Sequence, residues 1–127
     1  MRITFRKHPD NIDFAGVDLD PADIDGPTTV FEGSVREIAP RFPRNVNTMV
    51  TAALLSTGLD ACRGALIADP GLRHAVAEVE AWGADGSFVR TEKRVPATGV
   101  SGAEMPESVW LSVQRAARVH ESPVVQV

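Results

Sequence analysis

Two asparagines offer the chemistry that is easiest to assign. Asn45 and Asn47 straddle the start of a predicted helix. A carboxamide can orient a bound molecule because it offers a hydrogen-bond donor and an acceptor without carrying charge. One of the two can therefore cap the helix while the other points into a pocket. Both interpretations stay open for Asn45, whereas a cap explains Asn47 less well because it lies further into the helix.

Four side chains could move a proton to or from a bound molecule. Glu32 precedes a glycine at a predicted turn, and His74 begins a predicted strand directly after another turn. Glu78 and Glu80 share one face of that strand. His74 and Glu32 are the catalytic candidates. The competing interpretation makes all four ordinary surface residues, with His74 partly exposed at a sheet edge.

Residue spacing gives no support for a metal site. The three histidines stand at no metal-ligand spacing from one another, and Cys62 completes no zinc or iron set. The aspartates between residues 18 and 25 depart from a calcium-binding loop, because Ala22 stands where the third ligand would fall. We interpret them as a solvated acidic loop.

Composition narrows the class of protein. The 127 residues suit one domain, predicted over residues 1–120 with a flexible tail at 121–127. A net charge of −4 without a Lys/Arg cluster disfavours nucleic acids and anionic membranes as partners. The single cysteine fits a reducing, cytoplasmic setting, and the charged first residues form neither a signal peptide nor a membrane span.

The first half of the chain predicts two strands and two helices. Residues 1–7 alternate apolar and polar, which indicates a strand with one buried face, and residues 8–27 form a surface excursion with one short helical turn at 20–24. A strand over 28–32 ends at Gly33, which frees the backbone for a sharp turn. Ser34 and Glu37 form a capping box that starts a short helix. An amphipathic helix over 44–57 ends before Gly58.

The second half predicts three strands and a helix, over 62–68, 74–82, 87–95 and 104–119, with a hairpin turn at 83–86. A further capping box joins Ser101 and Glu104. The order of elements indicates an α+β fold, a mixed and largely antiparallel sheet with helices packed on one face. We expect Ala75, Ala77 and Ala81 to form a smooth outward face, through which the chain forms a homodimer.

Neither of the two common phosphate-binding glycine motifs is present in the sequence. Gly-x-Gly-x-x-Gly and Gly-x-x-x-x-Gly-Lys-Ser/Thr both place backbone N–H groups around a phosphate at a helix start. The chain therefore offers no recognisable place of its own for a nicotinamide cofactor.

Several stretches together resemble the catalytic domain of L-aspartate dehydrogenases. They are Phe31-Glu32-Gly33-Ser34, Phe42-Pro43-Arg44-Asn45-Val46-Asn47, the turn Ala68-Asp69-Pro70 and the opening from Ile3 to Pro9, and the resemblance covers residues 1–95. In that family an N-terminal Rossmann domain binds NAD or NADP, and the domain resembled here supplies the substrate pocket and the subunit contact. The resemblance implies that Gly33, Ser34, Asn45 and Asn47 bind the substrate, aspartate, during its reversible oxidative deamination.

Three departures from the family pattern limit what the resemblance implies. Counting from Asp69-Pro70 without gaps, Ala75 and Ala77 stand where the family has the Asn and the catalytic His of its Asn-x-His pattern. Alanine cannot move a proton. The segment before the last helix reads Gly102-Ala103-Glu104-Met105-Pro106 in place of the family's Asn-Pro-Lys-Thr-Ser, and the 127 residues do not include the family's nucleotide-binding domain.

These observations lead to one expectation and two alternatives. We expect a divergent, stand-alone aspartate-dehydrogenase-like domain that acts on or binds a small metabolite. It uses NAD(P) and acts as a dehydrogenase only with a separate Rossmann-domain protein. The first alternative is a biosynthetic isomerase, cyclase or lyase that needs no nicotinamide. The second is a non-catalytic, dimeric ligand-binding or scaffold protein.

Overall fold

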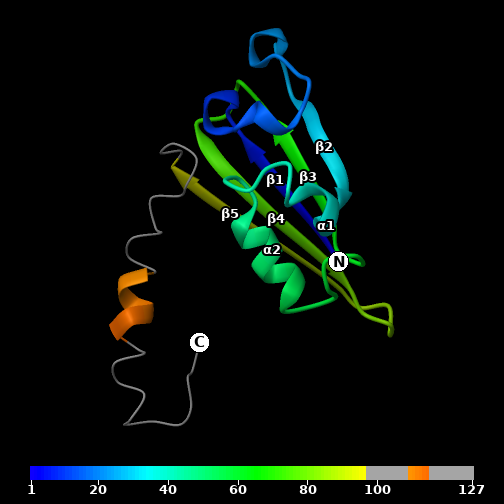
Figure 1. Ribbon diagram of the computed structural model, residues 1–127. Helices are drawn as coiled ribbons and strands as arrows, with labels where there is room; N and C mark the ends of the chain where they lie inside the picture. The colour runs from blue at the N-terminus through cyan, green and yellow to red at the C-terminus, as the bar shows by residue number, and fades with distance from the viewer. Residues whose placement is uncertain (97–108, 115–127) are drawn as a thin grey trace.

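The computed structural model describes residues 1–96 and 109–114 (Figure 1). Five strands form one sheet in the order β2-β3-β1-β4-β5. Their bounds are Arg2–Lys7 (β1), Thr28–Ser34 (β2), Arg63–Ala68 (β3), His74–Trp82 (β4) and Phe88–Pro96 (β5). Only β1 and β3 run parallel, and the other neighbours are antiparallel. The predicted mixed, largely antiparallel α+β sheet is confirmed.

Two helices cover one face of this sheet, α1 over Val35–Ile38 and α2 over Asn47–Leu54 (Figure 1). Gly64 of β3 shows how closely they pack, because a Cβ at this position would lie 2.6 Å from the Met49 sulfur and 3.3 Å from Ile38. Ile3 pairs with Gly64 across β1 and β3 and is 1% exposed. Paired residues share a face, so Ile3 marks the helix-side face of the sheet, and the opposite face is called the open face below.

The helix-side face holds most of the core. Its largest fully buried side chains are Phe42, Ile3, Ile38, Met49, Leu66, Val35, Val46 and Cys62. Ile3 and Phe5 are buried there, as the alternation in residues 1–7 predicted, but Thr4 is buried on the opposite face, so the centre of β1 is buried on both faces. Burial also raises the pKa of the Cys62 thiol, so this cysteine is a core residue with little thiolate character.

The predicted outward face of alanines is wrong. The register pairs Ala77 with Phe5 and Val79 with Ile3, so the alanines of β4 point to the helix side. Ala77 and Val79 also pack against the core. The sequence could not reveal this, because the alternation of β4 defines two faces without saying which one the helices cover.

Charged residues of β1, β4 and β5 occupy the open face instead, namely Arg2, Arg6, Glu78, Glu80, Arg90, Glu92 and Arg94. At its centre Glu78 is only 7% exposed, and its carboxylate accepts a hydrogen bond of 2.5 Å from the Arg90 guanidinium. That bond and the negative charge of Glu78 raise the pKa of Arg90. A homodimer through a sheet face stays a prediction, and the open face, where the alanines were expected, carries these charged residues instead.

The aspartates of the acidic excursion between residues 18 and 25 are exposed, as predicted, while its apolar residues hold it to the core. It contains three 3-10 turns, Pro9–Asn11, Phe14–Gly16 and Pro21–Asp23, where one turn at 20–24 was predicted. Asp13 and Asp20 cap two of these turns by accepting backbone N–H groups two residues on. Ile12 and Ile24, each less than 9% exposed, anchor the excursion in the core.

The helix predicted over 44–57 is shorter in the structure, which begins it at Asn47 and ends it at Leu54. Val46 is its N-cap, without a side-chain cap, so the interpretation of Asn45 as the cap is wrong. Gly58 has a φ of +83° and donates its N–H to the Ala53 carbonyl, which confirms it as the left-handed residue beyond the helix. The predicted hairpin turn is confirmed as well, with Gly86 at φ +83°.

Some predictions fall outside the described residues. Only 109–114 of the helix predicted over 104–119 is described, and that part is helical. The capping box of Ser101 and Glu104 and the tail at 121–127 lie outside. Within the described residues, no helix is long and apolar enough to cross a membrane. The same part of the chain holds no group of three His, Cys, Asp or Glu side chains that could bind a metal ion.

Candidate functional site

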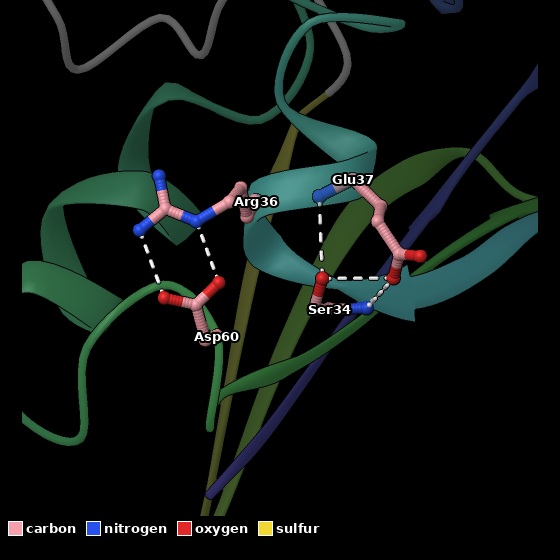
Figure 2. Close-up of polar contacts among 4 residues, drawn as sticks. All are labelled: Ser34, Arg36, Glu37 and Asp60. Atoms are coloured by element: carbon pink, nitrogen blue, oxygen red, sulfur yellow. Dashed lines mark hydrogen bonds and ion pairs between the residues drawn. The ribbon is translucent and has the colours of Figure 1, made fainter.

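The Ser34 side chain is engaged at the start of α1, where the predicted capping box is confirmed (Figure 2). The Ser34 hydroxyl accepts the Glu37 N–H, and the Glu37 carboxylate accepts both the Ser34 N–H at 2.7 Å and the Ser34 hydroxyl at 2.8 Å. These bonds lower the pKa of Glu37. Arg36 binds the Asp60 carboxylate through two nitrogens beside them, which lowers the pKa of Asp60.

Replacing Glu37 with Gln should flatten the acid limb of the stability profile. The folded-state pKa of Glu37 lies below its unfolded value, so its contribution is present above the unfolded pKa and is lost as pH falls through the folded pKa. Urea midpoints from neutral pH to about pH 3 should therefore fall less steeply in E37Q. Asp25→Asn, which removes an exposed carboxylate on the excursion, is the matched control. Equal acid slopes for E37Q and the unmodified chain would contradict the expectation.

No special backbone angle requires glycine at Gly33, but side chains pack closely around it. A positive φ is found only at Gly58 and Gly86 among the described residues, so the turn predicted at Gly33 does not need glycine's conformational freedom. Gly33 lies within β2, where a Cβ would lie 2.9 Å from both the Glu37 carboxylate and the Phe31 ring. The backbone instead bends into α1 after Ser34.

The Asn45 carboxamide hydrogen-bonds to the backbone of the excursion. Its side chain is buried, with 4% of the residue exposed, and its Oδ1 accepts the Asp13 N–H at 2.9 Å. Its Nδ2 donates to the Asn11 carbonyl at 2.8 Å. Arg44 adds an ion pair to the Asp13 carboxylate at 3.7 Å. Asn45 therefore ties the excursion to the segment before α2, a role that accounts for one donor and one acceptor of its amide.

The other residues predicted from this region do not converge on one pocket. Asn47 is exposed at the first residue of α2. Glu32 lies on the open face, where it forms an ion pair of 3.4 Å with Arg2. Its β3 partner Ala65 pairs with Thr4, which places Glu32 in the same open-face row as Glu78. Glu32 and Asn47 thus stand on opposite faces of the sheet.

His74 lies at a separate place, in an open-face pocket of about 220 Å³. The pocket lies where β4 begins and β5 ends, and its polar lining residues are Arg6, Asp69, Arg73, His74, Glu92 and Arg94. The prediction that His74 stands at a strand start near a pocket agrees with this placement. Neither Glu32 nor the two asparagines line the pocket, so the structure separates the two catalytic candidates.

The model of the family described as aspartate dehydrogenase, C-terminal, matches residues 1–118 of the chain. The chain belongs to this family. The match confirms the resemblance carried by the motifs between Ile3 and Pro70 and extends it beyond residue 95. Curated relatives and a solved structure agree.

The relatives are longer proteins. An L-aspartate dehydrogenase of Ruegeria pomeroyi is 44% identical over 70 residues, which cover 55% of this chain and 26% of that protein. An aspartate dehydrogenase domain-containing protein of Danio rerio is 34% identical over 119 residues, covering 89% of this chain and 43% of its own. The crystal structure of aspartate dehydrogenase from Thermotoga maritima matches with a TM-score of 0.65 and 28% identity, covering 99% of this chain and 46% of that chain. The chain spans less than half the length of these relatives.

Ala77 stands where the family resemblance has a histidine, and its neighbours across the sheet could not be identified from the sequence. Ala77 is half-buried on the helix-side face between Phe5 of β1 and Lys93 of β5. Lys7 lies further along β1 on the same face, where burial lowers the pKa of its ammonium. Period-two alternation places Ala77 and Lys93 on strand faces, but only the β4–β5 register brings the two together.

Proposed function

We propose that this chain is the metabolite-binding domain of an aspartate-dehydrogenase-type system and that it transfers hydride only together with a nicotinamide-binding domain. The observation that carries the proposal is the family match over residues 1–118, because this family corresponds to the C-terminal part of the aspartate dehydrogenases. The ligand class is a small amino acid or keto acid, in keeping with the name of those relatives. The 127 residues contain neither common glycine motif for a dinucleotide, so we place the nicotinamide cofactor, which exchanges hydride with the metabolite, on a separate domain.

We place the metabolite on the β4–β5 shelf, the half of the helix-side face formed by Ala75, Ala77, Val79 and Ala81 of β4 and Val89, Thr91, Lys93 and Val95 of β5. Support comes from where the helices lie. α1 contacts β2 and β3, and Met49 of α2 stands over Gly64 of β3. Val89, Thr91 and Lys93 are exposed in the described part of the chain, which leaves room for a ligand or a second domain.

A second candidate function, ligand binding without catalysis, is favoured by Ala77. The position where the family resemblance calls for a proton-carrying histidine holds a methyl group, and the carboxylates of β4 point to the opposite face. Glu78 there is bonded to Arg90. The nicotinamide-independent enzyme foreseen as another alternative gains no such support, because its acid and base candidates are separated.

Titration of the ¹⁵N-labelled chain with L-aspartate and with oxaloacetate, followed by amide shifts, tests the proposal. We expect saturable shifts at Ala77, Thr91 and Lys93. Glycine at equal ionic strength is the control, since it lacks the second carboxylate. The absence of shelf shifts up to about 50 mM ligand, a weaker affinity than enzyme substrates usually show, would contradict the proposed function.

A further inference from the structure

Paired residues of three neighbouring strands, β1, β4 and β5, line the open-face pocket beside His74. Val76 of β4 pairs with Arg6 of β1 on one side and with Arg94 of β5 on the other. Paired residues share a face, so the two arginines flank Val76 in one row. Val76 is only 9% exposed and provides an apolar floor. Arg73, in the segment between β3 and β4, adds a third guanidinium at the end of the row.

The two carboxylates of the pocket are already engaged. Glu92 accepts a hydrogen bond of 2.5 Å from the Arg94 Nε. Asp69 accepts the Gly71 N–H at 2.9 Å, which fixes the turn after β3. Arg6 and Arg73 form no ion pair with any residue that the structure describes. The pocket therefore combines three guanidinium groups with two carboxylates, one of them paired with Arg94, which leaves an excess of positive charge in a chain whose net charge is −4.

We propose that this pocket binds a small dianion with carboxylate or phosphate oxygens, held between Arg6 and Arg73. A guanidinium presents paired N–H donors in a plane that matches two oxygens of a carboxylate or phosphate. A volume of about 220 Å³ suits a small metabolite rather than a nucleotide. His74 at the rim offers a further hydrogen bond to the same anion.

This site is distinct from the shelf, because Val76 and Ala77 are neighbours on one strand and point to opposite faces. The inference therefore does not rest on the proposed function. A ligand could bind at either place, at both or at neither, and the affected amides distinguish these cases.

Calorimetric and NMR titrations of the full chain with succinate and with inorganic phosphate test the proposal. We expect saturable binding of at least one dianion, with the largest shifts at Arg6, Arg73 and Val76, and weaker binding as NaCl rises. Arg6→Gln and Arg73→Gln should each weaken binding about tenfold or more, since each removes a charge-assisted hydrogen-bonding group. Preference for succinate identifies a dicarboxylate site, and preference for phosphate identifies a phosphate site.

Arg63→Gln is the matched control. Arg63 is an exposed arginine of β3 on the same open face, at the strand end opposite the pocket. Its removal should leave binding unchanged. The proposal is overturned if neither dianion binds, or if R63Q weakens binding as much as R73Q does, which would indicate a diffuse charge effect. Because Arg73 is exposed between two strands, R73Q keeps the test valid even if R6Q fails to fold.

Discussion

Ala77→His should increase NAD(P)-dependent oxidation of aspartate about 10²- to 10⁴-fold when the chain is joined to a nicotinamide-binding domain, the range usual for one general acid–base group. The suitable protein is a chimera in which the half of the Thermotoga maritima relative that this chain does not match, proposed to bind the nicotinamide, precedes Met1. The expected gain follows from position. Residue 77 lies half-buried on the β4–β5 shelf, across from Lys93, where a longer side chain can extend above the sheet.

Absorbance of NAD(P)H gives the rates, compared with the unmodified chimera. Ala84→His is the matched control, because Ala84 is an exposed alanine of the hairpin turn between β4 and β5, outside the shelf. A histidine there should leave the rate unchanged. An additional Ala75→Asn change restores the Asn-x-His pattern in full and should raise the rate further. If A77H and A84H chimeras are equally slow while both bind aspartate, the assignment of position 77 as the lost proton carrier is wrong.

Asn45→Ala should lower the free energy of unfolding by about 2–3 kcal/mol. In the unmodified chain the Asp13 N–H and the Asn11 carbonyl bond to the buried carboxamide, and the change leaves both backbone groups without this partner. Urea denaturation followed by circular dichroism measures the loss. Asn47→Ala is the control, since this exposed asparagine makes no side-chain contact of that kind in the described residues, and its removal should change stability by about 0.5 kcal/mol or less.

The Asn45→Ala variant also tests whether Asn45 contacts a bound ligand or only holds the excursion in place. If Asn45 only holds the excursion, folded N45A should bind aspartate as the unmodified chain does. Weaker binding of aspartate by N45A, together with unchanged stability, would restore the role that the family resemblance implied for Asn45.

Local sequence patterns predicted most of the elements of the fold because their causes are local. The alternation in Met1–Lys7 needs only one buried face, and the box of Ser34 and Glu37 needs only one helical turn. The start of α2 at Asn47, later than the predicted start at residue 44, shows where local sequence patterns stop being sufficient. Asn45 is a good helix-capping residue, yet its amide bonds to groups 32 and 34 residues away, which no local rule foresees.

Strand pairing explains why the sequence did not reveal where the candidate site residues lie relative to one another. The sequence places Glu32 and the two asparagines close together in the chain, but β2 directs Glu32 to the open face while the helices lie on the other. His74 was linked to a pocket correctly. Its arginine neighbours were not foreseen, because Arg6 and Arg94 become neighbours of Val76 only through the registers of β1 and β5 with β4.

The most direct test of the central claim is NAD(P)H formation from L-aspartate by the unmodified 127-residue chain, measured alone and in the chimera at equal concentration. No NAD(P)H is expected from the chain alone, since the chain contains no glycine motif for the dinucleotide, and slow formation is expected in the chimera, where residue 77 is alanine. Turnover by the chain alone at a rate equal to the chimera's would contradict the claim that hydride transfer depends on a second domain.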